Sequence, residues 1–321
     1  MPFIEPSAPR EIVVRALLTL LGLVVGGGLL VAGLRLARRG REPRADTESR
    51  GAAVPLGLRY LTLMVLVVLV IGPAFLGGWI FVLAIAVIAL LGLREIWSVL
   101  DAAGTPAIRV PGFVCGVGLV PAAALGGAAA LAPVLGLGLA LIAAWGLFEG
   151  PTRLPQRVGG TLLGVIYVGL LCAFMVILRV GPHGFGRFLF FLVVIQLADL
   201  GGLFAGMVFG KHKLVPALSP GKTWEGLVGS LVLAAAGGGL FAFALPELGG
   251  LAPVLLALPL ALTGLLGDLL ASGFKRSVGF KDFGTTLPGH GGILDRFDSY
   301  LISAPFAWAL FSLLDRVAHR G

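Results

Sequence analysis

The sequence has little charge, no asparagine and only two cysteines, and each shortage excludes a class of protein. Charged residues make up 12% of the 321 residues, about half the share of a typical soluble domain, which excludes a soluble enzyme of this size. With 58% hydrophobic residues, the chain is not disordered either. Without asparagine it has no N-glycosylation site. Cys115 and Cys172 lie inside apolar runs, so we interpret both as core residues rather than a disulfide or a metal site.

The hydrophobic residues are grouped in long runs, which indicates an all-α, polytopic integral membrane protein. One span needs about 20 apolar residues, and the runs predict about ten transmembrane helices, with nine and eleven as alternatives. The predicted spans are 12–34, 60–76, 78–93, 108–126, 129–147, 160–178, 188–205, 224–244, 251–273 and 297–315.

The N-terminal region differs from the rest of the chain. Its apolar run is followed by an arginine-rich stretch and not by a small-residue cleavage site. We therefore interpret residues 1–59 as a signal-anchor helix with an Arg-rich cytoplasmic loop, and residues 60–321 as a multi-helix membrane domain.

Basic residues are distributed unevenly between the predicted loops. Cytoplasmic loops collect Lys and Arg, and with 35–59 placed in the cytoplasm, 18 of the 24 basic residues face that side. These residues are spread over short loops. We interpret the net charge of +8 as anchoring to anionic lipid headgroups and expect no nucleic-acid partner.

Two of the predicted cytoplasmic loops, 206–223 and 274–296, have an unusual composition. They hold all five lysines of the chain, whereas the other 19 basic residues are arginine. The lysines are Lys211, Lys213, Lys222, Lys275 and Lys281. A compact ammonium is a common phosphate partner, so these loops are candidates for phosphate chemistry.

Acidic residues gather in and beside the same two loops. Asp199 and Asp268 lie in apolar runs, where an unpaired carboxylate is costly, although a buried hydrogen bond or ion pair would explain either one alone. Asp295 and Asp298 have the i, i+3 spacing that puts both on one helical face. Oxygen ligands near phosphate favour Mg²⁺ over zinc. The pattern predicts a magnesium site at Asp268, Asp295 and Asp298.

A glycine-rich segment, GTTLPGHGG at 284–292, cannot remain helical. Such a segment can turn successive backbone N–H groups toward an anion. Taken alone, it predicts no more than a turn.

Taken together, these residues form segments that resemble the sequence motifs of a known family. The segments Ser272–Arg276, Lys281–Gly284 and Leu287–Asp298 together resemble the signature of the phosphatidate cytidylyltransferases, also called CDP-diacylglycerol synthases. The segments Phe209–Leu214, Ser219–Pro220 and Lys222–Gly226 resemble the family's other cytoplasmic motif. There, Met207, Gly221 and Leu203 replace an expected Arg, Lys and aromatic residue. The resemblance covers roughly residues 55–315.

The resemblance implies a function in phospholipid biosynthesis, the transfer of CMP from CTP to phosphatidic acid to give CDP-diacylglycerol and pyrophosphate. It implies Mg²⁺ as cofactor, leaves a second, monovalent cation open, and suggests a membrane-embedded homodimer. The protein would be a multi-pass protein of a bacterial-type inner membrane. Its catalytic half would lie at 199–299, and its active site would face the cytoplasm.

The same resemblance assigns roles to individual residues. Asp268, Asp295 and Asp298 would hold Mg²⁺, and Asp199 would assist them from a neighbouring helix. The catalytic residues would be Lys275, Arg276, Lys281, Asp282 and His290, of which the cations neutralise the triphosphate and His290 donates to a phosphate oxygen. The substrate-binding residues would be Ser219, Lys222, Thr223, Glu225, Gly291, Gly292 and Arg296.

Other functions remain open at this point. The acceptor could be another lipid, such as a prenyl-linked phosphate, or the chain could be a CTP-dependent lipid kinase or an inactive paralogue. A transporter also uses intramembrane acids and broken helices, but the chain shows no internal repeat, and its charge clusters at one predicted membrane face.

Overall fold

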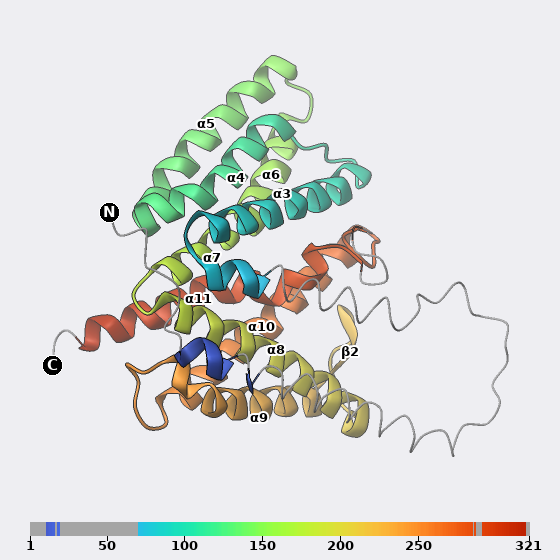
Figure 1. Ribbon diagram of the computed structural model, residues 1–321. Coiled ribbons are helices and arrows are strands. Elements are labelled where there is room, and N and C mark those ends of the chain that lie inside the picture. Colours follow the sequence, from blue (N-terminus) through green and yellow to red (C-terminus); the bar gives the residue numbers. More distant parts are fainter. Residues whose placement is uncertain (1–10, 17, 20–69, 285, 287–290, 319–321) are drawn as a thin grey trace.

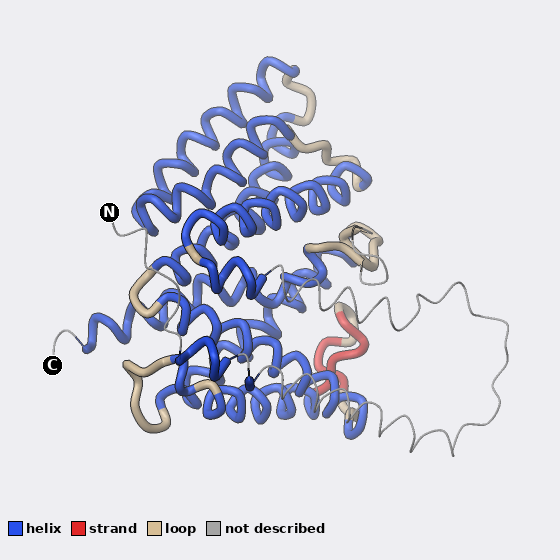
Figure 2. The backbone as a smooth tube through the Cα atoms, in the orientation of Figure 1, coloured by secondary structure: helices blue, strands red, loops and turns tan. Residues whose placement is uncertain are grey.

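A computed structural model describes residues 11–16, 18–19, 70–284, 286 and 291–318 (Figure 1). The predicted spans at 12–34 and 60–76 lie mostly outside these residues, as do most of the predicted N-terminal unit 1–59 and His290. The described part is a bundle of helices with one short antiparallel hairpin, drawn in red in Figure 2.

The elements follow one another with short connections. In chain order they are α3 (Gly78–Ala102), α4 (Arg109–Gly126), η1 (Gly127–Ala130), α5 (Leu131–Glu149), α6 (Leu154–Gly164), η2 (Val165–Leu170), α7 (Leu171–Val180), α8 (Gly184–Phe209), β1 (Lys213–Val215), β2 (Ser219–Thr223), α9 (Trp224–Leu240), η3 (Ala242–Ala244), α10 (Ala252–Ser277) and α11 (Leu294–Ala318).

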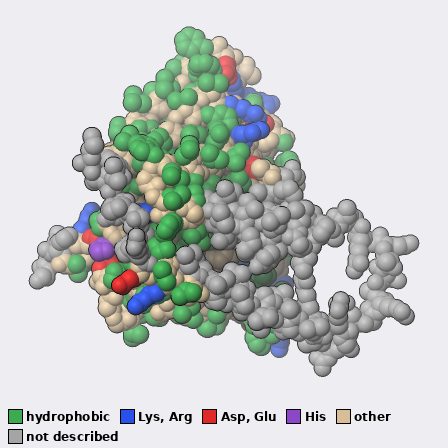
Figure 3. All heavy atoms as spheres, in the orientation of Figure 1, with side chains coloured by type: hydrophobic (Ala, Val, Ile, Leu, Met, Phe, Trp, Pro, Cys, Tyr) green, Lys and Arg blue, Asp and Glu red, His purple; other side chains and the backbone are tan. Residues whose placement is uncertain are grey.

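The outer faces of these helices are apolar. Leu83, Val114 and Leu137 are each more than 60% exposed, and hydrophobic side chains cover much of the face drawn in Figure 3. Within the described residues, six helical stretches are long and apolar enough to cross a membrane. The prediction of an all-α, multi-pass membrane protein is therefore confirmed, whereas the count of ten spans stays a prediction.

One of the six stretches, Arg109–Glu149, is a helical hairpin. It reverses after α4 at Gly127, where φ is +59°. A Cβ added at Gly138 of α5 would collide with Cys115 of α4, and one at Gly146 would collide with Ile108. This order of contacts makes α4 and α5 antiparallel neighbours.

Helix α3 is longer than the sequence pattern indicated. The predicted span 78–93 is part of a longer helix, which continues to Ala102. No helix-breaking residue precedes Gly104, where φ is +81°, and Pro106 follows directly. Arg94 and Glu95 thus lie on the last turns of a helix and not in a loop.

Glycines bring α8 and α9 unusually close together. A Cβ on Gly229 of α9 would lie 2.6 Å from the carbonyl oxygen of Gly201 of α8, and Gly226 faces Gly206 one turn further along. Small residues are what lets membrane helices approach backbone to backbone. The contact holds the β1–β2 hairpin, which leads into α9, against the C-terminal end of α8.

Helices α10 and α11 meet in the same way. A Cβ on Gly267 of α10 would lie 2.6 Å from the carbonyl oxygen of Asp298 of α11, while Gly264 packs against Ile195 of α8. Asp268 follows Gly267, and Asp199 lies about one turn beyond Ile195. The glycine contacts therefore bring an aspartate-bearing stretch of each of three helices to one place.

The helix formed by α6 and α7 contains a π-helical turn, η2, between them. Glycines before and within this turn allow it to pack closely against neighbouring helices. Gly164 lies directly against the Trp97 ring, and a Cβ on Gly169 would lie 2.6 Å from the carbonyl oxygen of Gly116. The sequence analysis did not predict this irregularity.

An ion-pair cluster around a buried arginine lies at the end of the bundle where α8 begins and α11 ends. Arg187, at the start of α8, is 4% exposed. Its Nε donates to Glu247 at 2.9 Å, and its two terminal nitrogens donate to the carboxylate of Asp315 at 2.8 and 2.6 Å. The cluster ties together α8, the segment after α9 and the end of α11.

We expect Arg187→Ala to lower the free energy of unfolding by about 3 kcal/mol, because it leaves Glu247 and Asp315 without their shared cation. Thermal unfolding of the purified protein in detergent measures the effect. The control is Arg316→Ala, which removes an exposed arginine from the same end. Equal melting temperatures for the two variants would contradict a stabilising role for the cluster.

Candidate active site

Lys222 forms an ion pair with one aspartate and is influenced by two others, each on a different helix. The ammonium of Lys222, on β2, lies 2.5 Å from a carboxylate oxygen of Asp268 on α10. Asp199 on α8 and Asp298 on α11 also act electrostatically on Lys222. Asp298 in turn lies near Asp268 and Asp199. The Gly267–Asp298 backbone contact places Asp268 and Asp298 on adjoining stretches of α10 and α11, and the metal site predicted at Asp268, Asp295 and Asp298 stays a prediction.

The lysine keeps its charge in this setting. Burial alone would lower the pKa of Lys222, but the carboxylate of Asp268, supported by Asp199 and Asp298, raises that pKa above its ordinary value. Three acids with one lysine leave an excess of negative charge. The cluster can therefore accept a further cation.

The hairpin that carries Lys222 is held by its own side chains. Thr223 caps α9, since its hydroxyl accepts a hydrogen bond from the Gly226 N–H at 3.0 Å. Glu225 contacts the ring of His212 at 2.7 Å and also accepts from the His212 backbone N–H at 3.3 Å. In this structure Thr223 and Glu225 position Lys222, while Ser219 lies half-buried at the start of β2.

Asp295 has different neighbours from Asp298. One of its oxygens accepts from the ammonium of Lys275 at 2.7 Å, and the other accepts from the backbone N–H groups of Phe283 and Gly292, both at 2.9 Å. Both oxygens are thus engaged within the protein. Asp295 fixes the ends of the glycine-rich segment and orients Lys275.

Glu95 of α3 is a residue that the sequence analysis missed. It is 6% exposed, and its carboxylate accepts hydrogen bonds from the backbone N–H groups of Ile293 and Leu294 at 2.9 and 2.8 Å. It also accepts from the Thr286 hydroxyl at 2.5 Å. These amides belong to the start of α11, where a carboxylate is favoured by the helix dipole.

The glycines of the segment make room for this acid. A Cβ on Gly292 would lie 2.5 Å from Glu95 Oε2, and one on Gly284 would lie 2.9 Å from Oε1. Gly291 has φ +80°, a conformation that favours glycine. The amide of Gly292 turns inward to Asp295, so we attribute close packing to this glycine rather than an approach to phosphate.

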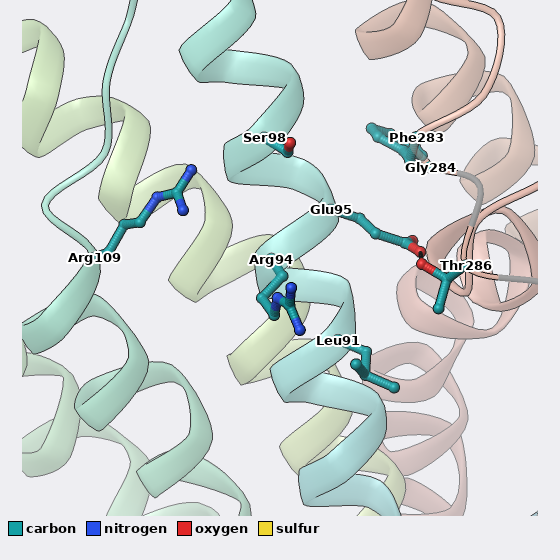
Figure 4. A pocket seen from close by; sticks show the side chains of 8 residues that line it. All are labelled: Leu91, Arg94, Glu95, Ser98, Arg109, Phe283, Gly284 and Thr286. Atoms are coloured by element: carbon teal, nitrogen blue, oxygen red, sulfur yellow. Dashed lines mark hydrogen bonds between the residues drawn. The ribbon is translucent and has the colours of Figure 1, made fainter.

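A cavity of about 340 Å³ lies between α3 and the glycine-rich segment (Figure 4). Its lining includes Arg94 and Ser98 of α3, Arg109 of α4 and Gly284. Figure 4 shows Glu95 and Thr286 pointing toward each other across its wall. The cavity opens beside the segment whose ends Glu95 and Asp295 hold.

The remaining predicted site residues lie around the segment. Arg276, Lys281, Asp282 and Arg296 are exposed, so the cations among them can meet an anion arriving from solvent. Asp282 lies close to Gly291. His290 is outside the described residues.

The aspartate cluster has the chemistry of a magnesium site but not the closed geometry of one. As the side chains stand, no three carboxylate, imidazole or thiol groups in the described part of the chain are close enough to hold an ion. The donor set around Lys222 is nevertheless made of carboxylate oxygens with an excess negative charge, which is the chemistry that Mg²⁺ requires. Asp295 has donors on both oxygens, whereas Asp298 accepts the Ser299 N–H on one oxygen and Asp268 pairs with Lys222, so the last two have more capacity left for an ion.

Comparison with known proteins gives a consistent result. Residues 57–314 match the cytidylyltransferase family. A protein of Mycobacterium bovis named phosphatidate cytidylyltransferase is 33% identical over 299 residues, which cover 85% of this chain and 93% of that protein. A Staphylococcus aureus protein of the same name is 33% identical over 264 residues, covering 77% of this chain and 96% of its own.

We expect Glu95→Ala to release the start of α11, because two backbone amides and the Thr286 hydroxyl lose a shared acceptor. Hydrogen exchange of the Ile293 and Leu294 amides should accelerate by at least about tenfold. The control is Glu149→Ala, which removes an exposed glutamate paired with Arg157. Unchanged exchange in Glu95→Ala would show that the carboxylate does not hold this segment.

Proposed function

Since the chain belongs to the cytidylyltransferase family, we propose that its aspartate cluster is the site at which CMP is transferred from CTP to phosphatidate. The products are CDP-diacylglycerol and pyrophosphate, so the protein acts in phospholipid synthesis. The observation that carries the assignment of the site is the Lys222–Asp268 ion pair beside the Gly267–Asp298 contact, with Asp199 and Asp298 within electrostatic range of Lys222. The names of the relatives support the reaction.

The reaction needs positioning and charge neutralisation more than proton transfer. An oxygen of the phosphatidate phosphate attacks the α-phosphorus of CTP, a new P–O bond forms, and the bond to the β-phosphate oxygen breaks. The attacking oxygen is already anionic at neutral pH, so no strong general base is required. In-line placement and neutralisation of the departing pyrophosphate then determine the rate.

The basic residues near the cluster are arranged for this neutralisation. Lys275 is buried and oriented by Asp295 at 2.7 Å, which gives it a fixed direction. Arg276 and Lys281 are exposed, so their side chains can neutralise the charge of the pyrophosphate while it dissociates. Lys222 lies among the carboxylates and is available to a substrate phosphate that enters the cluster.

We propose Asp199, Asp268 and Asp298 as the residues that hold Mg²⁺. The ion would neutralise phosphate charge and polarise the reacting phosphate. Asp295, which the sequence analysis grouped with the ligands, is assigned instead to holding the glycine-rich segment and Lys275. A second, monovalent cation has no residues assigned to it, and the homodimer stays a prediction.

We further propose that the site faces the cytoplasm. The end of the bundle that carries the site also carries the last turns of α3 and α5 and the first turns of α4 and α6 (Figure 1). Four arginines belong to these segments or directly precede them: Arg94, Arg109, Arg153 and Arg157. Cytoplasmic ends of membrane helices collect such residues. CTP is a cytoplasmic solute and the phosphatidate headgroup lies at the membrane surface, so a site at this level meets both substrates.

Purified protein in lipid nanodiscs is expected to convert CTP and phosphatidate to CDP-diacylglycerol, with release of one pyrophosphate per product. Product is measured with radiolabelled CTP. Chelation with EDTA should abolish turnover, and added Mg²⁺ should restore it. Parallel reactions with a polyprenyl phosphate or with diacylglycerol test the other acceptors. Turnover with one of these and none with phosphatidate would overturn the proposed substrate.

Asp298→Asn should lower kcat at least about 100-fold, because it removes one of three anionic oxygen donors. The variant should also need more Mg²⁺ for half-maximal activity. Asp101→Asn is the matched control, since Asp101 is on the same end of the bundle and pairs with Arg109 outside the cluster. Near-normal turnover by Asp298→Asn would exclude this aspartate as a ligand.

A further inference from the structure

The hydroxyl of Tyr167 is buried without a partner. The residue is 3% exposed, and its hydroxyl has no hydrogen bond; within the described residues the only other buried side-chain polar atom in this state is Trp97 Nε1. A buried donor without an acceptor destabilises a folded protein and is rare. A hydroxyl in this position is explained if its acceptor arrives with a ligand.

Tyr167 lies in the middle of the π-helical turn η2, where the regular hydrogen bonding of an α-helix is interrupted. The turn is held by the contacts of Gly164 with Trp97 and of Gly169 with Gly116. Such turns occur often at functional sites.

Tyr167 lies close enough to the aspartate cluster to interact with it electrostatically. Asp298, Asp268 and Asp295 all act on its hydroxyl in this way. On the side of α10 it packs edge-on against Phe274, with the ring centroids 5.2 Å apart. Phe274 directly precedes Lys275, so the tyrosine and the lysine approach the cluster from adjoining positions.

Tyr300 provides an internal comparison. Its ring also lies near Asp199 and Asp298, but its hydroxyl lies 3.0 Å from the side-chain oxygen of Gln196 and 3.5 Å from the carbonyl oxygen of Leu192. Proximity to the acids is thus common to both tyrosines. Of the two, Tyr167 alone lacks a partner for its hydroxyl.

We propose that Tyr167 donates a hydrogen bond to a phosphate oxygen of a substrate bound at the aspartate cluster. A phenol keeps its proton at neutral pH and can donate, and phosphate oxygens are acceptors of the kind that this hydroxyl lacks within the protein itself. Lys222 and Lys275 offset part of the negative charge of the aspartates. A neutral hydroxyl donor does not, so the negative charge that attracts a metal ion is kept. The inference rests on the proposed function, and the phosphate belongs either to the nucleotide or to the lipid headgroup.

The test is Tyr167→Phe in the full-length protein in nanodiscs. We expect kcat/KM to fall by about tenfold to 100-fold, with a melting temperature equal to or above that of the wild type, because no protein hydrogen bond is lost. CTP is varied at saturating phosphatidate, and then phosphatidate at saturating CTP. A raised KM for CTP alone assigns the contact to the nucleotide, a raised KM for phosphatidate alone assigns it to the headgroup, and a fall in kcat alone assigns it to the transition state.

The matched control is Tyr300→Phe, which removes a hydroxyl that has protein partners. Here the melting temperature should fall while kcat/KM stays within about threefold of the wild type. Tyr167→Phe with unchanged kinetics, or with a lower melting temperature and no kinetic effect beyond that of Tyr300→Phe, would overturn the proposal.

A failure of the proposed function gives a different result. In that case the wild type itself makes no product from CTP and phosphatidate. The hydroxyl is then tested by binding of radiolabelled CTP and of phosphatidate vesicles to both proteins. Weaker binding of either probe by Tyr167→Phe supports the contact, and equal binding of both overturns it.

Discussion

The site depends on keeping three carboxylates together where they repel one another. Asp199, Asp268 and Asp298 come from separate helices, and at the edge of an apolar bundle their repulsion is weakly screened. Two features offset it. Glycine contacts such as that of Gly267 bring the backbones too close for the acids to separate, and Lys222 supplies a cation between them. The β1–β2 hairpin holds Lys222 in place, and the close contacts of α8 with α9 and of α10 with α11 hold the backbones.

A second principle governs the glycine-rich segment, whose ends are fixed by buried acids. Glu95 and Asp295 accept hydrogen bonds from the backbone amides on either side of it. These amides would otherwise be candidates for binding anions. The exposed Lys281, just before the segment, extends toward solvent, while the bonded amides serve the fold. For these four amides the fold supplies the acceptor, and the phosphate contacts that we propose come from side chains of α10 and the hairpin.

Much of this was predictable from sequence because it is local. Apolar runs predicted the helices, and motif spacing placed Asp268 and Asp298 on elements that meet. The features that sequence reasoning missed are long-range or irregular. Glu95 lies nearly 200 residues from its partners, and no periodicity links the two. The π-turn at Tyr167 depends on packing against Trp97, and nothing in its own residues distinguishes it from an α-helix. For Asp295, the spacing did not indicate that Lys275 and two backbone amides already engage its carboxylate.

The contact of Glu95 with Gly284 and Gly292 also constrains how the protein can evolve. A longer residue at either glycine would overlap the carboxylate, and a shorter residue at position 95 would leave the start of α11 without its acceptor. The three positions should therefore change together among descendants of this chain or not at all. The C-terminal half, which contains the glycine-rich segment, therefore depends on Glu95 of α3. A recombinant that joined this half to an unrelated N-terminal half would lack the Glu95 carboxylate as acceptor.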